Sequence, residues 1–545
     1  MKKINDAPSA RWLGACAVAL LLSLGGCSGD DGDDGEDGLA GAPGADGVSC
    51  WDLNENGVAD ADEDINNDGV VDVLDCQQTP NIADAETLHA AYFADRPYEG
   101  TESCLACHGE IGDDILTTGH FKWEGVATNL EGVEGEIHGK NDIINNFCVA
   151  VPSNEGRCTQ CHIGYDYADA SYDFGDRTKI DCFACHDQTG TYSKAPPLAG
   201  RPPASVDLQA VAQSVGANGG VPTRRACLFC HAGAGGGDNV KHGDLSSDLI
   251  ATTREFDVHM AVDGANLSCV DCHGVERDAS GAMMSHGIGG MPYHSVDEGD
   301  MKQCTDCHGD SANIHAGSSV QNTVTSHTRL ACQACHIPAI ARKLPTKTEW
   351  YWEDAGQDID PIPVDPVTGK ETYNKMKGTF AWATDVRPEL RFFDGKWNKT
   401  LINVNDQYTS VPVDLGSPAT DYTNPDAKIY PFKKLIGNQP ADANNNTILV
   451  PHLFGTAGGP NPYWGSYDWN LALQDGALAA GQVYTGQYEF VDTVSLWSVN
   501  HEIAPKEMAL GMGGDCGDCH GGDQVDWAAL GWSDDPVVGG TRPGL

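Results

Sequence analysis

Eight copies of Cys-x-x-Cys-His determine which chemistry this 545-residue sequence can perform. Two thiols three positions apart can both form thioethers with a porphyrin, and the imidazole that follows is then held beside the iron. A zinc site or a disulfide framework would need the histidine after every cysteine pair to be accidental, whereas a shuffled chain would contain about 0.03 copies. The sequence therefore predicts eight c-type haems, attached through Cys104, Cys107 and His108; Cys158, Cys161 and His162; Cys182, Cys185 and His186; Cys227, Cys230 and His231; Cys269, Cys272 and His273; Cys304, Cys307 and His308; Cys332, Cys335 and His336; and Cys516, Cys519 and His520.

The elements that position these residues must be short. Seven motifs fall between Cys104 and His336, so each haem has only about 33 residues around it and the porphyrins must form much of the core. The fold class we predict is a multihaem c-type cytochrome, with mainly short α-helices and loops wrapped around eight haems and little β-structure. The haem-bearing domain covers residues 79–545. Within it, a haem-free insertion at about 337–515 is expected to be irregular with some hairpins.

Histidines outside the motifs are the candidates for the sixth ligand of each iron. Imidazole on both faces gives a low-spin haem that transfers electrons, and an iron with a weaker sixth ligand is where a substrate can react. The candidates outnumber the irons, so counting alone does not identify the odd site. They are His89, His120, His138, His242, His259, His286, His294, His315, His327, His452 and His501.

Cys148 is a thiol without an evident role. The motifs use sixteen of the 21 cysteines, two lie in the N-terminal segment, and Cys50 and Cys76 bracket a loop and are expected to form a disulfide. Cys148 precedes the second motif by ten residues. A buried, inert cysteine is the alternative, but a lone thiol near a haem in an exported redox protein favours a functional role.

The N-terminus has the features of an export signal. Lys2, Lys3 and Arg11 precede an apolar stretch that is too short to span a bilayer. The stretch ends in Leu-Gly-Gly-Cys27, which resembles a bacterial lipobox. We predict a signal peptide at 1–26 and a lipid anchor on Cys27 at the outer membrane, on its periplasmic side or at the cell surface. An ordinary signal peptide is the alternative.

Residues 27–48 have glycine at every third position and are rich in aspartate. This collagen-like spacing is short and contains one proline, Pro43, so an acidic extended tether is favoured over a trimerising stalk.

Residues 49–78 hold two consecutive loops with the oxygen-ligand pattern of calcium sites. No helix separates the loops, so they look more like dockerin or thrombospondin-type repeats than an EF-hand. A solvated acidic loop is the alternative to two Ca²⁺ sites. The predicted ligands are Asp52, Asn54, Asn56, Val58, Asp60 and Glu63 in the first loop, and Asp64, Asn66, Asp68, Val70, Asp72 and Asp75 in the second.

The formal charge of −46 restricts the partners. It argues against nucleic acid and against an anionic membrane surface, and it suits cations, metal oxides or basic redox proteins. A small anionic substrate would need a local basic funnel. Candidates for it are Arg157, Arg177, Lys179, Arg224 and Arg225.

The chain resembles the octahaem tetrathionate reductases over most of residues 100–345 and again at 500–520. The matching segments are Asn145-Asn146-Phe147-Cys148, Ile180-Asp181-Cys182, Gly235–Asp244, Asp257–Met260, Cys332–Pro338 and the late eighth motif. The resemblance implies seven bis-histidine haems and a lysine, Lys241, opposite His162 at the second motif. It implies a catalytic pocket of Lys241, Asn145, Cys148 and Asp238. The distal ligands it implies for the other haems are His120, His242, His259, His286, His315, His327 and His501.

These features predict an exported reductase of tetrathionate, nitrite or hydroxylamine at the His/Lys-ligated haem. Redox partner proteins or quinol-linked cytochromes would supply its electrons. A homo-oligomer is a further possibility that the sequence leaves open. The first alternative is a non-catalytic extracellular electron conduit, on the surface or in a filament, which the acidic N-terminal segments favour. The second is oxidation of hydroxylamine or hydrazine, the chemistry of a different octahaem family, and no motif here supports it.

Overall fold

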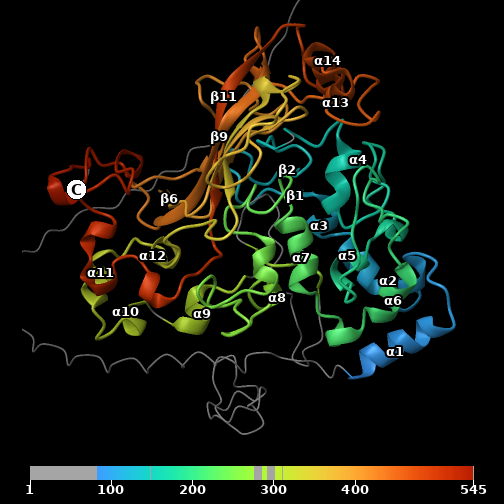
Figure 1. Cartoon of the computed structure of the whole chain (residues 1–545), viewed down its shortest axis with the longest axis horizontal. Helices are drawn as coiled ribbons and strands as arrows, with labels where there is room; N and C mark the ends of the chain where they lie inside the picture. The colour runs from blue at the N-terminus through green and yellow to red at the C-terminus, as the bar shows by residue number, and fades with distance from the viewer. Residues whose placement is uncertain (1–82, 148, 275–284, 291–300, 310, 544–545) are drawn as a thin grey trace, which may run out of the picture. The chain divides into compact units, whose positions relative to one another are not determined.

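The computed structural model describes residues 83–147, 149–274, 285–290, 301–309 and 311–543, all within one compact unit, 48–545 (Figure 1). The predicted signal peptide, tether and calcium loops lie outside these residues, as do Cys148 and His294.

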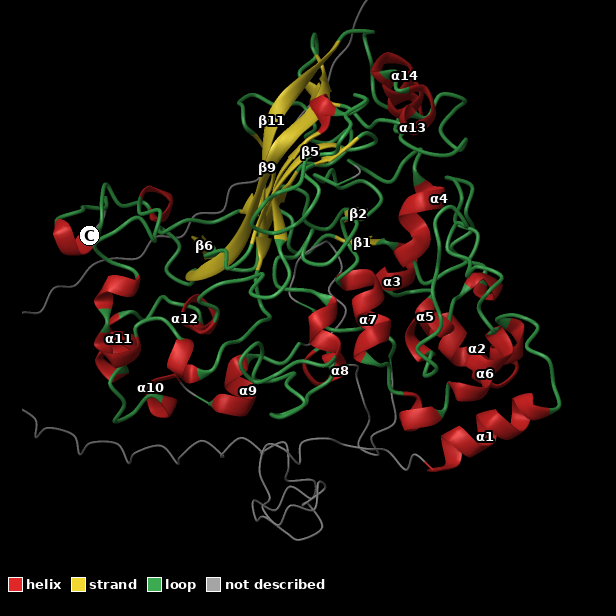
Figure 2. Cartoon of the chain, viewed as in Figure 1, coloured by secondary structure: helices red, strands yellow, loops and turns green. Residues whose placement is uncertain are grey.

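Short helices joined by long loops carry the first seven motifs (Figure 2). Most last one or two turns, which is enough to place a motif but too short to form without tertiary support. The motifs lie on α2 (Glu102–Ile115), α4 (Glu155–Cys158) with η3 (Thr159–Cys161), α5 (Phe183–His186), α7 (Arg224–His231), α8 (Cys269–Cys272), α9 (Cys304–His308) and α12 (Cys332–His336). The α-helices between and before them are α1 (Ala83–Ala94), α3 (Gly119–Lys122), α6 (Leu208–Ser214), α10 (Ser311–Ile314) and α11 (Gln321–Ser326).

Side-chain caps fix where several of these helices begin. The Thr223 hydroxyl accepts a hydrogen bond from the Ala226 amide at the start of α7. Ser268 and Asp271 form a reciprocal capping box at the start of α8. A cap satisfies amides that have no partner inside the helix, so it allows a single turn to start at a defined residue.

A nine-stranded sheet follows the seventh motif. Its main path runs through β4 (Tyr373–Asn374), β5 (Gly378–Ala383), β3 (Thr346–Tyr351), β9 (Lys428–Asp442), β11 (Tyr488–Ser498), β8 (Val413–Pro418) and β7 (Trp397–Lys399), while β6 (Glu389–Phe393) and β10 (Thr447–Ile448) also pair with β9. The β3–β9 and β11–β8 pairs are parallel and the others are antiparallel. Helices α13 (Tyr463–Ser466) and α14 (Trp469–Ala479) lie between β10 and β11 in the chain. A separate two-stranded sheet pairs β1 (Glu124–Val126) with β2 (Ile137–Gly139).

The expectation of little β-structure is therefore wrong: the interval 337–515 contains a nine-stranded sheet, in which β4–β5 and β9–β10 are hairpins as expected. Its longest strand, β9, contains Pro431, Gly437 and Pro440, which are depleted in strands. Lys433 and Asn438 on the same strand are buried. Because both faces of β9 are covered, its sequence shows no alternation of apolar and polar residues to indicate a strand.

The sheet's core reaches into the motif-bearing half of the chain. Phe147 and Val240 are buried in the same cluster as Trp350, Leu435 and Trp497. Each such buried side chain contributes about 1.5–3 kcal/mol relative to exposure. The sheet thus fixes the segments that contain Phe147, just before the second motif, and Val240, just before Lys241.

Within the described ranges, no helix combines the length and apolarity that crossing a bilayer requires.

The β3–β9 pairing can be tested at Gly437. A Cβ at this position would lie 1.9 Å from the carbonyl oxygen of Trp350. We expect Gly437→Ala to cost about 1–3 kcal/mol, because the strands must separate to admit the methyl group. Thermal unfolding followed by circular dichroism measures the change. Gly465→Ala in α13, where the nearest atom is 3.5 Å away, is the control. An unshifted midpoint for Gly437→Ala would contradict the pairing.

Candidate functional site

The attachment motifs present their reactive groups on one side of a helical turn. Positions i, i+3 and i+4 of a helix share a face, so both thiols and the imidazole of a motif point the same way. Helices α5, α9 and α12 each end at the motif histidine. None of the sixteen motif cysteines forms a disulfide with any described residue. This donor set fits covalent haem attachment and not a disulfide framework.

Six motif histidines lie opposite a second histidine. An iron between two imidazoles separates the ring centres by about 6 Å, and these six ring pairs lie at that spacing. The centroid separations are 5.9 Å for His108 and His89, 6.2 Å for His231 and His120, 6.2 Å for His273 and His501, 5.8 Å for His308 and His259, 6.2 Å for His336 and His315, and 6.3 Å for His520 and His327.

Hydrogen bonds at Nδ1 orient many of these rings. A histidine ligand is usually fixed through the nitrogen that does not bind the metal. Backbone carbonyls hold His89 and His273, each at 2.8 Å. Carboxylates of Asp535 and Asp244 hold His520 at 2.7 Å and His501 at 3.0 Å. In these four rings Nε2 is the nitrogen left for an iron.

The third motif follows the same rule. His186 is held at Nδ1 by the Gly220 carbonyl at 2.8 Å. The charge of His286 acts on both His186 and His108, and its own Nδ1 lies 3.0 Å from Asp114. His286 is therefore the candidate for the second axial position at the third motif.

The distal positions differ from the predicted set at two histidines. His89, which is not among the distal ligands that the resemblance implies, faces His108. Its helix α1 packs against α6, where Phe93, Val211 and Ala212 share a buried cluster. His242, which was expected to be axial, has its ring edge-on to Trp497 at 5.7 Å. No motif marks His89 in the sequence, so spacing alone could not pair it with His108.

Two further histidines have other contacts. His138 lies between Asp142, at 2.5 Å, and Glu136, at 3.4 Å. His452 is fully buried, and its Nε2 lies 3.0 Å from the Phe454 carbonyl.

Cysteines of different motifs touch one another. Side-chain contacts join Cys104 to Cys182, Cys227 to Cys269, and Cys304 to Cys332. They link the first motif to the third, the fourth to the fifth, and the sixth to the seventh.

The second motif contacts the fourth motif through a cysteine of each. Cys230 Sγ lies 3.8 Å from the carbonyl oxygen of Cys161, and the two thiols are also in contact.

The second motif has a different environment from the others. His162 is fully buried, and its ring packs against five aromatic rings at centroid distances of 5.2 to 6.0 Å; these belong to Phe121, Trp123, Tyr167, Tyr172 and Phe174. Its Nε2 is 2.5 Å from the Phe121 carbonyl, and its Nδ1 has no hydrogen-bond partner among the described residues. The thiols of this motif fit haem attachment. Its imidazole, however, is held through Nε2, whereas the rings described above are held through Nδ1.

A buried ion pair supports the backbone of the second motif. Lys194 Nζ lies 2.7 Å from Asp181 Oδ2 and also donates to the His162 carbonyl. Hydroxyl groups of Tyr165 and Tyr192 donate to the same carboxylate, each at 2.8 Å. A buried pair with these additional hydrogen bonds has its charges well compensated.

Lys241 lies beside the second motif. Its charge and that of Cys161 act on each other, and its Nζ is 4.9 Å from the centroid of Trp497. Burial, then the nearby charges of Lys140 and Lys399, hold the pKa of Lys241 well below its usual range. Burial also lowers the pKa of Lys399 to about 7.

Lys433 of β9 clamps the turn that carries Lys241. Its Nζ donates to the carbonyls of Val240, at 2.6 Å, and Asn239, at 3.0 Å. Thr346 donates to the same Asn239 carbonyl at 2.6 Å. Asn239 is fully buried with φ +59°, a left-handed backbone that is held only where its surroundings require it. The sheet therefore sets the position of Lys241.

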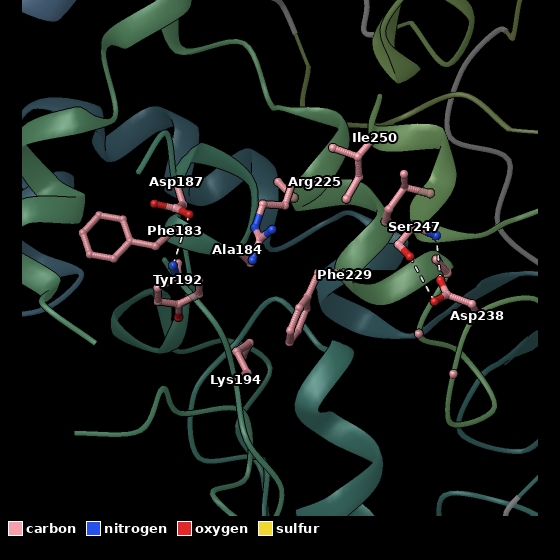
Figure 3. A pocket seen from close by; sticks show the side chains of 15 residues that line it. Phe183, Ala184, Asp187, Tyr192, Lys194, Arg225, Phe229, Asp238, Ser247 and Ile250 are labelled. Atoms are coloured by element: carbon pink, nitrogen blue, oxygen red, sulfur yellow. Dashed lines mark hydrogen bonds between the residues drawn. The ribbon is translucent and has the colours of Figure 1, made fainter. Parts of the chain in front are cut away.

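Two other predicted pocket residues are engaged in local turns. The Asn145 side chain accepts a hydrogen bond from the Phe147 amide at 2.9 Å. Asp238 accepts from the amide and hydroxyl of Ser247, at 2.6 and 3.0 Å (Figure 3). Cys148 lies outside the described residues.

Asp238 also lines a cavity of 270 Å³ between α5 and α7, together with Lys194, Arg225 and Phe229 (Figure 3). Phe183 and Ala184 of the third motif and Leu228 and Phe229 of the fourth border it. These residues lie between the cysteines of their motifs, on the side of each helix opposite the thiols.

Most of the candidate funnel residues have other partners. Arg177 pairs with Asp113 at 3.0 Å, and Lys179 with Asp166 at 3.0 Å. Arg224 donates to the Leu267 carbonyl, and Arg157 lies 4.8 Å from the Trp464 ring centroid. Arg225, which borders the cavity, is the remaining candidate.

Known proteins resemble this chain in three comparisons. A family model described as "Cytochrome c bacterial" matches residues 347–523, which include most of the sheet and the eighth motif. The crystal structure of octahaem cytochrome c from Shewanella oneidensis is 38% identical, with a TM-score of 0.69, over 82% of this chain and 98% of that one. An uncharacterized protein from Archaeoglobus fulgidus is 25% identical over 34% of this chain and 76% of its own length.

The two differing distal positions give a direct test. We expect His89→Ala to convert one iron to a high-spin form, because its ring faces that of His108, and to remove about one-eighth of the haem signal from the low-spin population. His242→Ala should leave the bis-imidazole population unchanged. Electron paramagnetic resonance of the oxidised protein measures both. Loss of a bis-imidazole signal in His242→Ala, with His89→Ala unaffected, would contradict the observed pairing.

The clamp predicts a role for Lys433 in positioning Lys241. Lys433→Met removes two hydrogen bonds to buried carbonyls, at a cost of about 1–3 kcal/mol, and frees the turn. We expect the spectroscopic signature of the second haem to change while those of the other seven stay.

Lys433→Arg should restore part of that signature. Lys434→Met is the matched control, since Lys434 is the next residue on β9 and pairs with Glu389 at 2.7 Å. A spectrum unchanged by Lys433→Met would show that the clamp does not set the second site.

Proposed function

The chain belongs to the multihaem c-type cytochromes, and we propose that it is an exported octahaem reductase of small sulfur or nitrogen oxyanions, tetrathionate and nitrite, with hydroxylamine as a further substrate. The observation that carries the proposal is the difference between the second motif and the rest. Six motif histidines face another imidazole, whereas His162 is surrounded by aromatic rings and Lys241 lies beside its motif. A site that differs in ligation from its neighbours is the natural place for a reaction.

The division of labour follows from ligand chemistry. Haem with two imidazoles would supply one-electron transfer without an open position, and haem with a weaker second ligand would supply a site for substrate. We propose that Lys241, with Asn145, Cys148 and Asp238, forms the substrate side of the second haem, as the resemblance to the tetrathionate reductases implies. Lys433 holds the Lys241 turn, and Lys194 holds the His162 backbone.

The contacts among the motifs suggest the route of electrons. Side-chain contacts join motifs one and three, four and five, and six and seven. Electrostatic interactions join three to four through Cys185 and Cys230, five to six through Cys272 and Cys307, and seven to eight through Cys335 and Cys519. The second motif branches from the fourth at Cys161. A reduction at the second motif that needs several electrons could receive them through the fourth motif from both directions, from motifs one and three and from motifs five to eight.

An electron conduit without catalysis is the second candidate function. The continuous series of motifs favours it, and so does the exposure of Cys304 and Cys307 of the sixth motif and Cys516 of the eighth. On this alternative, the second motif would bind no substrate and the electrons would pass between partners at exposed haem edges.

We further propose that residues 1–78 export the protein, anchor it and bind calcium. They are a signal peptide, a lipid anchor at Cys27 on the outer membrane, an acidic tether and two Ca²⁺ sites. The net charge of −46 supports basic redox proteins as electron partners.

Lys241 tests the reductase directly. We expect Lys241→Ala to lower kcat/KM for tetrathionate and nitrite by at least about a hundredfold, because the second haem loses the distal group that distinguishes its site. The seven other haems should stay low-spin. Reduction of tetrathionate, nitrite and hydroxylamine is measured side by side with one electron donor.

Lys375→Ala is the control, since Lys375 is exposed and pairs with Asp358 at 2.6 Å. If all eight haems were low-spin and bis-histidine and the protein bound neither nitrite nor tetrathionate, the proposal of a reductase would be refuted. The electron conduit would then be the function that remains.

A further inference from the structure

Glu155 is a buried acid at the start of α4, three residues before Cys158 of the second motif. It is 5% exposed, and its Oε2 has no hydrogen-bond partner among the described residues. Positions i and i+3 of a helix share a face, so the Glu155 carboxyl and the Cys158 thiol lie on the same side of α4. An unsatisfied buried oxygen is unfavourable for stability, so one beside the second motif needs a physical reason.

Backbone contacts fix the position of this carboxyl group. Hydrogen bonds from the backbone at Glu155 and Ser153 act on it. The Thr159 hydroxyl lies 2.6 Å from the Glu155 carbonyl oxygen and 2.8 Å from that of Tyr167, so it holds these two segments together. Burial, together with the nearby charge of Asp169, raises the pKa of Glu155, and the backbone hydrogen bonds offset only part of this rise. The acid can therefore take up a proton closer to neutral pH than an exposed glutamate can.

Tyr167 leads from Glu155 to the second motif. The charges of Glu155 and Cys158 both act on Tyr167. The Tyr167 ring packs against His162 at a centroid distance of 5.3 Å, and its hydroxyl donates to Asn141 Oδ1 at 3.0 Å. Polar groups thus continue from Glu155 to the residues that surround the second motif.

Asp169 leads from Glu155 to the solvent. Asp169 is exposed, and its charge acts on Glu155. Its carboxylate accepts from the amide and hydroxyl of Ser171, at 2.9 and 2.5 Å. A Cβ at Gly156 would lie 3.9 Å from the Ala168 carbonyl oxygen, so the loop that carries Asp169 packs directly on α4. Glu155 is therefore the buried acid between a surface carboxylate and the second motif.

We propose that Glu155 is a proton-relay residue, which passes protons from the solvent at Asp169 to the second motif while a nitrogen compound is reduced there. The proposal rests on the proposed function, because it concerns the substrate of that site. At each step Glu155 gives one proton toward the substrate and takes one from the solvent side. The electrons come from a one-electron donor supplied to the protein.

The three candidate substrates differ in their need for protons. Reduction of nitrite to ammonium takes up six electrons and eight protons and releases two water molecules. Reduction of hydroxylamine to ammonium takes up two electrons and three protons and releases one water molecule. Tetrathionate takes up two electrons, its central S–S bond breaks, and two thiosulfate ions form without any proton. A proton relay therefore matters for the two nitrogen compounds and not for tetrathionate.

This difference between substrates tests the relay in the haem-loaded full chain. We expect Glu155→Gln to lower kcat for nitrite and hydroxylamine by about tenfold or more, because the amide keeps the shape but does not exchange a proton in this way. The rate with tetrathionate should stay unchanged. Nitrite turnover by the wild type should fall as the pH rises through the raised pKa of Glu155, and Glu155→Gln should lack this step.

Matched variants separate the relay from a general loss of negative charge. Glu124 is half-buried, and its charge also acts on Tyr167, so Glu124→Gln is the control for Glu155→Gln. Asp169→Asn should slow nitrite reduction. Asp173→Asn should not, since Asp173 is an exposed acid of the same loop that accepts from the Gly175 amide at 2.8 Å.

Infrared spectroscopy gives a readout that needs no substrate. An electron that arrives at the second motif adds negative charge there, which favours protonation of a nearby acid. Reduced-minus-oxidised difference spectra of the wild type should therefore contain the carbonyl stretch of a protonated carboxylic acid. This band should be absent in Glu155→Gln and present in Glu124→Gln.

Two results would overturn the relay even if Lys241→Ala has lost reductase activity. One is an equal slowing of nitrite and tetrathionate in Glu155→Gln, and the other is an infrared band that Glu155→Gln leaves in place. If the wild type reduces none of the substrates but shows a band that depends on Glu155, the reductase is removed and proton uptake at Glu155 stands. If Glu155→Gln does not fold, Tyr167→Phe removes only a hydroxyl on the route: nitrite reduction should slow, tetrathionate reduction should not, and equal effects on both would again overturn the relay.

Discussion

Two imidazoles that share one iron must face each other at a fixed spacing, and most of this fold follows from that requirement. Six ring pairs lie 5.8 to 6.3 Å apart, and the members of most pairs come from distant parts of the chain. Most motifs lie on helices of one or two turns, and the longer α2 departs from helical backbone angles at its motif histidine, His108. Capped single turns at the motifs and hydrogen bonds at Nδ1 are the local means by which the rings meet. The long loops between these short helices allow the two histidine rings of each pair to be positioned independently of the other pairs.

The sheet performs a different task from the helices. An imidazole ligand arrives on a rigid ring with two nitrogen atoms, one of which can be anchored. A lysine ligand arrives on four flexible carbons and has no second atom for an anchor. At Lys241, the lysine ligand that we propose, the backbone is fixed instead: Lys433 and Thr346 bind carbonyl groups immediately before it. The match of residues 347–523 to a cytochrome family model agrees with a sheet that belongs to the core of the protein.

The sequence was most informative where chemistry is local. A Cys-x-x-Cys-His motif contains its own geometry, so the prediction of eight attachment sites rests on spacing alone. The distal ligands depend on which segments meet in space, and the resemblance to a family supplied His120, His259, His315, His327 and His501, which the structure opposes to motif histidines. It missed His89, because its pairing depends on how α1 docks.

The strand β9 could not be predicted for a related reason. Buried on both faces and interrupted by Pro431 and Pro440, it lacks the alternation by which strands are recognised. Lys433, whose position on β9 is essential to the Lys241 turn, reads in the sequence as an ordinary surface lysine. Its burial is a property of the sheet and of the turn together, and neither segment alone indicates it.

Adjacent residues of α3 serve two different motifs. His120 faces His231 of the fourth motif, and the carbonyl of Phe121 holds the ring of His162 in the second. A single peptide unit therefore connects the two. A rotation of the His162 ring away from the Phe121 carbonyl would therefore act on the backbone that also carries His120. The ring of His162 in the second motif and the His120–His231 ring pair of the fourth therefore share α3 as a common support.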